Sequence, residues 1–243
     1  MRKTLLLSAI ATMLATACGS QQTPREQAPT DAISLHENLP GDSTLYGLAC
    51  DGCTDSLLIF LPFSGGDPDT FNIIEAWQER RIYGRPHIGD ELAVLLNPEQ
   101  RGEALMVINL NMLRGQWCYM VTPTLRRPAN GQAAPALPDS IRRRLLAPHE
   151  YGFRLKSDNS AYSLGIRRQT TADAMSIVQY PDVKHYTEWH ILNGKLILKA
   201  DTIPGMAQKT LPESDTASIV LLRRDSLVLR FSDHEQAYYR KNS

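Results

Sequence analysis

Turn residues divide the second half of the chain into short apolar runs, and this rhythm constrains the fold more than any other feature. Asn193-Gly194 separates two of the runs and is a strong signal for a two-residue β-hairpin. Within residues 227–231, Leu and Phe alternate with Val and Arg, as in a strand with one face in the core. The pattern predicts consecutive strands within residues 150–157, 161–168, 186–192, 195–201, 216–224, 226–231 and 236–241.

A further strand at Trp117 brings the expected number to eight. Eight antiparallel strands in chain order predict an up-and-down barrel whose interior can hold one small ligand. Between the first two strands, residues 140–147 carry apolar side chains on one side and arginines on the other, which predicts a short helix capped by Asp139 or Ser140. We interpret its three arginines as a solvated face.

The first half of the chain also reads as strands and turns. Residues 43–112 contain four or five short strand-like runs, which predict a small antiparallel barrel or sandwich. Asp51-Gly52 predicts a tight hairpin, and residues 70–84 favour a strand followed by a turn over a helix. The fold class is therefore all-β: this small N-terminal module is followed by an eight-stranded barrel with one short helix, over residues 113–243.

The first residues predict export. Residues 1–17 hold a short basic region, an apolar stretch too short to cross a bilayer and small residues before Cys18, as in a signal peptide. Cys18 in this position resembles the lipidated cysteine of a bacterial lipobox, although a plain secretory cut near Ala17 is the alternative. Residues 18–42 are polar and aperiodic and predict a disordered tether. We expect an acylated protein anchored in the outer membrane by lipid alone.

Three positions carry a resemblance to a known family. Gly115-x-Trp117 on the first barrel strand, a short helix after it and Arg240 on the last strand resemble the lipocalin-like barrels. The stretch from residue 188 to residue 241 also resembles the C-terminal part of lipocalin-like lipoproteins from Bacteroidota. The resemblance covers about half the chain. It implies that the tryptophan packs at the closed end of the barrel under the arginine, in a cation–π contact.

Charge is unevenly distributed although the formal net charge is zero. Residues 43–112 carry 4 Arg or Lys against 10 Asp or Glu, a net of −6, whereas residues 113–243 carry 19 against 12, a net of +7. The zero total argues against nucleic acid as a partner. The opposite signs are consistent with two docked domains, and equally with two independently solvated faces.

Cys50 and Cys53 form the arrangement that most resembles reactive chemistry. They bracket a hairpin turn rather than a helix N-terminus, which argues against a redox dithiol. A zinc site would need a second ligand pair, and the sequence offers none at suitable spacing. We therefore interpret the pair as flanking a turn and as candidates for a structural disulfide in an oxidising compartment. Cys118 reads as a small packing residue.

No catalytic or metal-binding pattern emerges. His185 and His190 are expected on opposite faces of one strand, and Asp67 and Asp69 are interpreted as turn residues. We expect no cofactor and no enzymatic activity. The predicted function is binding, either of a small apolar ligand by barrel residues that the sequence does not identify, or of an envelope protein by a scaffold with a filled barrel. An envelope hydrolase is the weakest alternative.

Overall fold

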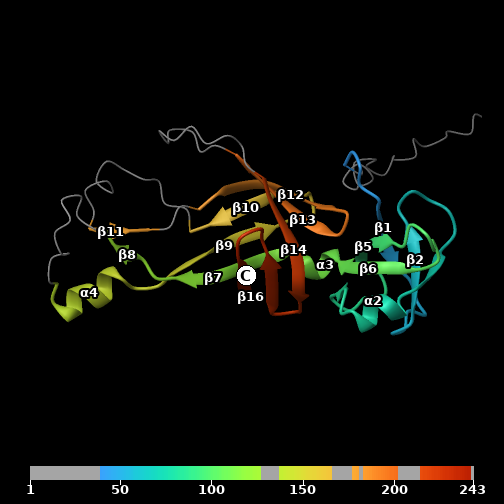
Figure 1. Ribbon diagram of the computed structural model, residues 1–243, viewed down its shortest axis with the longest axis horizontal. Helices are drawn as coiled ribbons and strands as arrows, with labels where there is room; N and C mark the ends of the chain where they lie inside the picture. The colour runs from blue at the N-terminus through green and yellow to red at the C-terminus, as the bar shows by residue number, and fades with distance from the viewer. Residues whose placement is uncertain (1–38, 127–136, 166–176, 181–182, 202–213, 242–243) are drawn as a thin grey trace, which may run out of the picture.

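A computed structural model describes residues 39–126, 137–165, 177–180, 183–201 and 214–241. The predicted signal peptide, Cys18 and most of the predicted tether lie outside these residues. The described part is elongated, with a small β-body at one end, a larger β-body in the middle, and the helix α4 (Asp139–Leu145) at the other end (Figure 1). No helix among the described residues is long and apolar enough to cross a membrane.

The larger body is an antiparallel sheet of eight strands in the order β10-β9-β7-β16-β15-β14-β13-β12. The last strand returns to the first through the pairs Tyr239↔Cys118 and Arg240↔Trp117, which curls the sheet into a barrel. This confirms the predicted up-and-down barrel of eight strands. Their bounds are β7 Gly115–Val121, β9 His149–Leu155, β10 Ala161–Leu164, β12 His185–Leu192, β13 Lys195–Asp201, β14 Ser214–Leu222, β15 Ser226–Arg230 and β16 Glu235–Arg240.

A serine side chain helps to close the remaining seam, between β10 and β12. Backbone contact at this seam is limited to the bridge Ser160↔Glu188 and a bond of 2.8 Å from the Trp189 N–H to the Asn159 carbonyl, within the described residues. Ser163 Oγ accepts a hydrogen bond of 2.8 Å from the Tyr186 N–H and donates one of 2.7 Å to the Lys184 carbonyl. The barrel is therefore nearly closed.

The smaller body is a sheet in the order β3-β2-β1-β5-β6-β4. A parallel bridge Asn72↔Glu103 brings β3 to the start of β6, so the five longer strands form a partly open barrel. Their circular order, with a helix between β3 and β5 along the chain, is the connectivity of the OB-fold. This confirms the barrel of the two predicted alternatives, barrel or sandwich, except that β4 pairs with β6 in parallel. Connectivity alone assigns no function. The strands are β1 Thr44–Ala49, β2 Leu57–Pro62, β3 Asp69–Asn72, β4 Ile82–Tyr83, β5 Glu91–Leu96 and β6 Ala104–Asn109.

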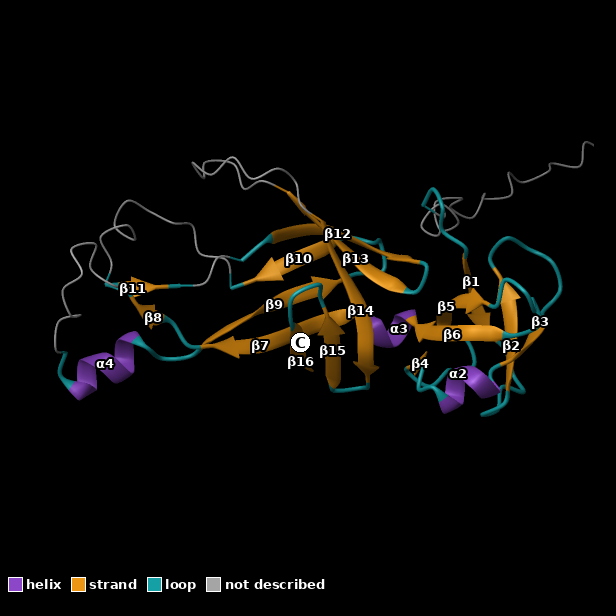
Figure 2. Ribbon diagram, in the orientation of Figure 1, coloured by secondary structure: helices purple, strands orange, loops and turns teal. Residues whose placement is uncertain are grey.

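The described residues contain three short helices rather than the expected one (Figure 2). Residues 70–84 include α2 (Ile74–Gln78). Asn72 Oδ1 accepts a hydrogen bond from the Ile74 N–H at the start of this helix, and the helix buries Ile73 and Ala76 under the sheet. The predicted strand is present at the start of this stretch, in β3 (Asp69–Asn72), but the predicted turn after it was wrong, because α2 forms there. The α3 helix (Leu110–Leu113) joins the two bodies.

The α4 helix forms where a helix was predicted, but its cap differs. Its N-cap residue is Pro138, with no side-chain cap hydrogen bond, so the expected cap by Asp139 or Ser140 was wrong. The helix buries no residue, and Ile141 is 47% exposed. Beside α4 in Figure 2 lies a two-stranded ribbon, β8 (Thr124–Leu125) with β11 (Val178–Gln179).

The two predicted hairpins have different outcomes. Asn193 and Gly194, with φ of 48° and 77°, form the two-residue turn between β12 and β13, as predicted. β1 and β2 also pair as a hairpin, but their connection runs over residues 50–56 instead of two residues. The Cys50 N–H still pairs with the Ile59 carbonyl, and a second turn follows 51–52, which lengthens the loop.

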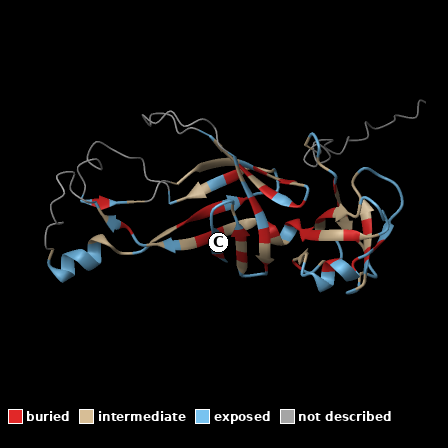
Figure 3. Cartoon of the chain, viewed as in Figure 1, coloured by how far each residue is buried: buried red, intermediate tan, exposed pale blue. Residues whose placement is uncertain are grey.

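The two bodies share one hydrophobic core. Ala93 and Ile108 of the small barrel, with Leu110 and Leu113 of α3, belong to the cluster that fills the large barrel. Figure 3 shows buried residues running from one body through α3 into the other. A second cluster, which includes Leu58, Phe60, Phe71, Leu92, Val94 and Val107, fills the small barrel.

Polar contacts reinforce this junction at the β12–β13 turn. The Asn193 N–H donates to Asp42 Oδ1 at 2.9 Å, and the Ser43 N–H and hydroxyl donate to Asn193 Oδ1. Tyr46 Oη donates to the Ile191 carbonyl at 2.8 Å. The docked interpretation of the charge asymmetry therefore agrees with the structure, although apolar packing and neutral hydrogen bonds supply most of the contacts described.

Candidate functional site

The closed end of the large barrel is built around Trp117 and Arg240. The Arg240 guanidinium carbon lies 4.1 Å from the centre of the Trp117 ring, which is fully buried. Gly115 has φ of +129°, and a Cβ there would clash with Arg240 Nη1, because the two atoms would be closer than van der Waals contact allows. The structure thus brings together the three residues that the resemblance singled out. A residue larger than glycine at position 115 would displace the guanidinium, so only glycine lets the first strand lie this close to Arg240.

The same two side chains satisfy the end of α3. Arg240 Nη2 donates to the Met112 carbonyl, Arg240 Nη1 to the Arg114 carbonyl at 2.8 Å, and Trp117 Nε1 to the Leu113 carbonyl at 2.7 Å. A helix leaves its last carbonyls without intrahelical partners, so these three bonds cap α3. Burial lowers the pKa of Arg240, which stays a cation because an arginine titrates far above neutral pH. This end of the barrel is closed by its own chain.

Packed side chains fill the interior next to α3. Six inward-facing residues are between 0 and 2% exposed: Trp117, Trp189, Leu196, Leu198, Leu227 and Leu229. The Trp189 indole N–H is also satisfied, donating to the Lys156 carbonyl at 2.9 Å. The interior next to α3 is therefore filled, and any remaining space lies on the side away from α3.

A second, aromatic layer lies on that side. Tyr119 is two residues beyond Trp117 along β7, and Tyr186 precedes Trp189 on β12, away from the junction with the small barrel. The ring centroids of Tyr119 and Tyr238 are 5.3 Å apart, those of Tyr238 and Phe153 5.1 Å, and those of Phe153 and Tyr186 6.2 Å, all edge-to-face. Four rings from four strands thus form a continuous chain of contacts, which we call the aromatic layer.

One ion pair borders the aromatic layer. Asp215 accepts a hydrogen bond of 2.6 Å from Tyr186 Oη, and Lys184 Nζ lies 2.5 Å from its other oxygen. Burial, followed by the hydrogen bond to Asp215 and then the charge of that carboxylate, holds the pKa of Tyr186 far above its ordinary value. Sequence inspection did not find Asp215 or Lys184, because they meet only when β12 and β14 lie on the two sides of β13.

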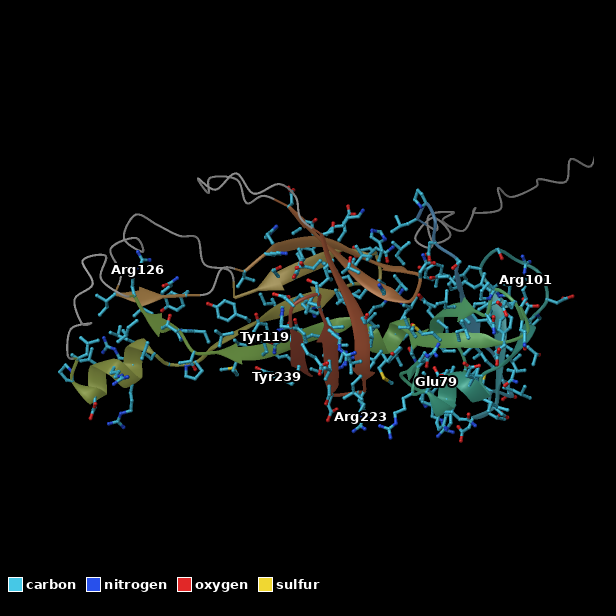
Figure 4. All side chains as sticks on the ribbon, viewed as in Figure 1. Glu79, Arg101, Tyr119, Arg126, Arg223 and Tyr239 are labelled. Carbon is cyan, nitrogen blue, oxygen red and sulfur yellow. The ribbon has the colours of Figure 1, made fainter. Side chains whose placement is uncertain are left out.

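Two hydroxyls of the aromatic layer have no hydrogen-bond partner among the described residues: those of Tyr119 and Tyr238. Tyr238 is only 8% exposed. Burial, then the neighbouring Tyr119 and Asp215, raises the pKa of Tyr238, and burial raises that of Tyr119, so both phenols are neutral at physiological pH. The rings of Tyr119 and Tyr238 are the pair in edge-to-face contact described above. Figure 4 labels Tyr119 among the barrel strands.

The cysteine pair lies at the opposite end of the molecule, in the small barrel. Cys50 and Cys53 are half-buried free thiols on the β1–β2 connection, and Cys53 Sγ accepts the Ile59 N–H at 3.4 Å. Their disulfide stays a prediction. Cys118 is fully buried beside Gln116 Nε2, and burial raises the pKa of its thiol.

The histidines of β12 are placed differently from the expectation. A β-bulge between Tyr186 and Glu188 shifts the alternation, so Tyr186 and Trp189 both face inward and His185 and His190 both face outward. The expected opposite faces were therefore wrong, but five residues of strand separate the two rings by about 16 Å. No group of three or more potential metal ligands occurs among the described residues.

Comparisons with known proteins add little. No protein-family model and no curated protein matches the chain. A solved structure of a lipocalin-like protein from Bacteroides thetaiotaomicron VPI-5482 is similar over 53% of this chain and 95% of that chain, with 22% identity and a TM-score of 0.31. At that TM-score the likeness carries no argument, and the fold rests on the strand order and register described above.

Proposed function

We propose that the protein is a non-enzymatic envelope lipoprotein, anchored through an acylated Cys18, whose large barrel binds a small ligand at its open end. One observation carries the binding proposal: the hydroxyls of Tyr119 and Tyr238 have no partner among the described residues, although Tyr238 is 8% exposed. Both hydroxyl oxygens still reach solvent, so a molecule that covers them removes their water and is favoured when it supplies an acceptor in its place.

The filled layer below changes where the ligand is expected. The sequence suggested a ligand inside the barrel, but Trp117, Trp189 and the leucines around them occupy the half next to α3. The aromatic layer offers apolar area with a few polar groups that can fix an orientation, as small-molecule sites do. The filled half supports a second candidate, a scaffold that contacts envelope proteins and binds no small molecule.

Native mass spectrometry separates the two candidates. The full-length protein is purified from the envelope fraction under conditions that leave bound molecules in place. It is compared with its Tyr119→Ala/Tyr238→Ala variant. The control is Tyr239→Ala, which changes an outward-facing neighbour whose hydroxyl donates to Glu150. We expect a non-covalent adduct of defined mass on the wild type and on Tyr239→Ala, and its loss from the double variant. A wild type without an adduct would favour the scaffold.

A further inference from the structure

We infer that the ligand of the aromatic layer is an uncharged molecule with a flat ring system and at least one oxygen acceptor, rather than an acyl chain or an ion. This inference rests on the proposed binding function and specifies its chemical class. It follows from three properties of the site: its unpaired donors, its compensated charge and its limited depth.

The unpaired donors select for an acceptor. The phenols of Tyr119 and Tyr238 are neutral, and each can donate one hydrogen bond. Their rings are in edge-to-face contact with centroids 5.3 Å apart, so one ligand can reach both side chains. A carbonyl or hydroxyl oxygen of such a ligand can accept a hydrogen bond from these donors. A hydrocarbon would leave both unsatisfied and is disfavoured.

The compensated charge selects for a neutral molecule. Asp215, the carboxylate that borders the aromatic layer, is already paired with Lys184 and accepts from Tyr186. The Asp215 side chain is 21% exposed, so the pair is partly removed from water. An anionic ligand would compete with Asp215 for Lys184, and a cationic ligand would compete with Lys184 for Asp215. Either competition leaves one partly buried charge without its partner, which is costly.

The depth of the site and its lining select for a ring. The packed layer of Trp117, Trp189 and Leu198 lies beneath, so an extended chain cannot pass toward α3. The side chains at this level are aromatic: the partly exposed rings of Tyr119 and Tyr186 lie against Phe153 and Tyr238 and offer ring surface on which a flat ring can stack.

Four matched probes test the inference: 2-acetylnaphthalene, naphthalene, 2-naphthoate and palmitate, titrated into the full-length protein by calorimetry. The first three share one ring system and differ in acceptor and charge. We expect 2-acetylnaphthalene to bind most tightly. We also expect Tyr119→Phe and Tyr238→Phe each to weaken it about three- to tenfold, the worth of one hydrogen bond, because these variants keep the rings.

Tyr239→Phe is the matched control, since it removes a hydroxyl at the next position from the outer face of the barrel. Its affinity for 2-acetylnaphthalene should equal that of the wild type. Tighter binding of palmitate or 2-naphthoate, no binding of any probe, or an unchanged affinity in both site variants would overturn the chemical class. The binding function itself would survive those results, provided the native adduct is lost when both tyrosine rings are removed.

Discussion

Replacing Gly115 by alanine tests whether the Arg240–Trp117 contact holds the two bodies together. The new Cβ would meet Arg240 Nη1, a group that cannot move freely because it donates to the Arg114 carbonyl while the guanidinium lies on Trp117. A positive φ costs a non-glycine residue about 1–2 kcal/mol. Loss of one charged hydrogen bond costs about 1.5–3 kcal/mol more. We therefore expect Gly115→Ala to lower the free energy of unfolding by about 2.5–5 kcal/mol.

Gly65→Ala supplies the matched control, because Gly65 has φ of +90° and a Cβ there would meet nothing within 4 Å. It carries the backbone strain alone, and we expect a loss of about 1–2 kcal/mol. Urea unfolding followed by tryptophan fluorescence measures both variants, with Trp117 and Trp189 reporting from the large barrel. If the free energy of unfolding falls no further in Gly115→Ala than in Gly65→Ala, the Arg240 guanidinium does not stabilise this junction and the reasoning fails.

Three further predictions concern other parts of the chain. Cys18→Ser should move the protein from the membrane pellet to the soluble fraction and abolish incorporation of labelled palmitate; membrane retention would contradict the lipid anchor. Cys50 and Cys53, in protein purified without reductant, should resist alkylation by iodoacetamide until reduced, and two modified thiols beforehand would refute the disulfide. The hydrogen bond from the Tyr239 hydroxyl to Glu150 raises the pKa of Tyr239 to about 12. Because this folded-state pKa is raised, the contact stabilises the fold below pH 10 and is lost as the pH rises toward 12; an ultraviolet titration of wild type against Tyr239→Phe should show one phenol ionising late.

The strands of the large barrel were predictable because each carries its own signal. Alternation over residues 227–231 and the Asn193-Gly194 turn report on local conformation, and the structure places strands and a turn there. Local signals failed where a tertiary contact decides the outcome. The α2 helix forms because Ile73 and Ala76 are buried under the sheet, and the bulge on β12 puts His185 and His190 on the same face.

The candidate site was beyond the reach of the sequence for a related reason. Tyr119, Tyr186, Asp215 and Tyr238 come from four strands and meet only after the barrel has closed. Each position reads in sequence as an ordinary inward-facing aromatic residue or a solvated charge. By contrast, Gly115, Trp117 and Arg240 were found because a resemblance supplied the relation between the first and last strands.

The central claim, a ligand at the open end above a filled interior, is tested most directly by NMR of the protein labelled in its tyrosine rings and tryptophan indoles. On addition of an envelope lipid and small-molecule extract, the account predicts shifts of the Tyr119 and Tyr238 ring signals. The indole N–H signals of Trp117 and Trp189, held by the Leu113 and Lys156 carbonyls, should stay in place. Shifts of both indoles with unmoved tyrosines would place the ligand in the closed half and contradict the account.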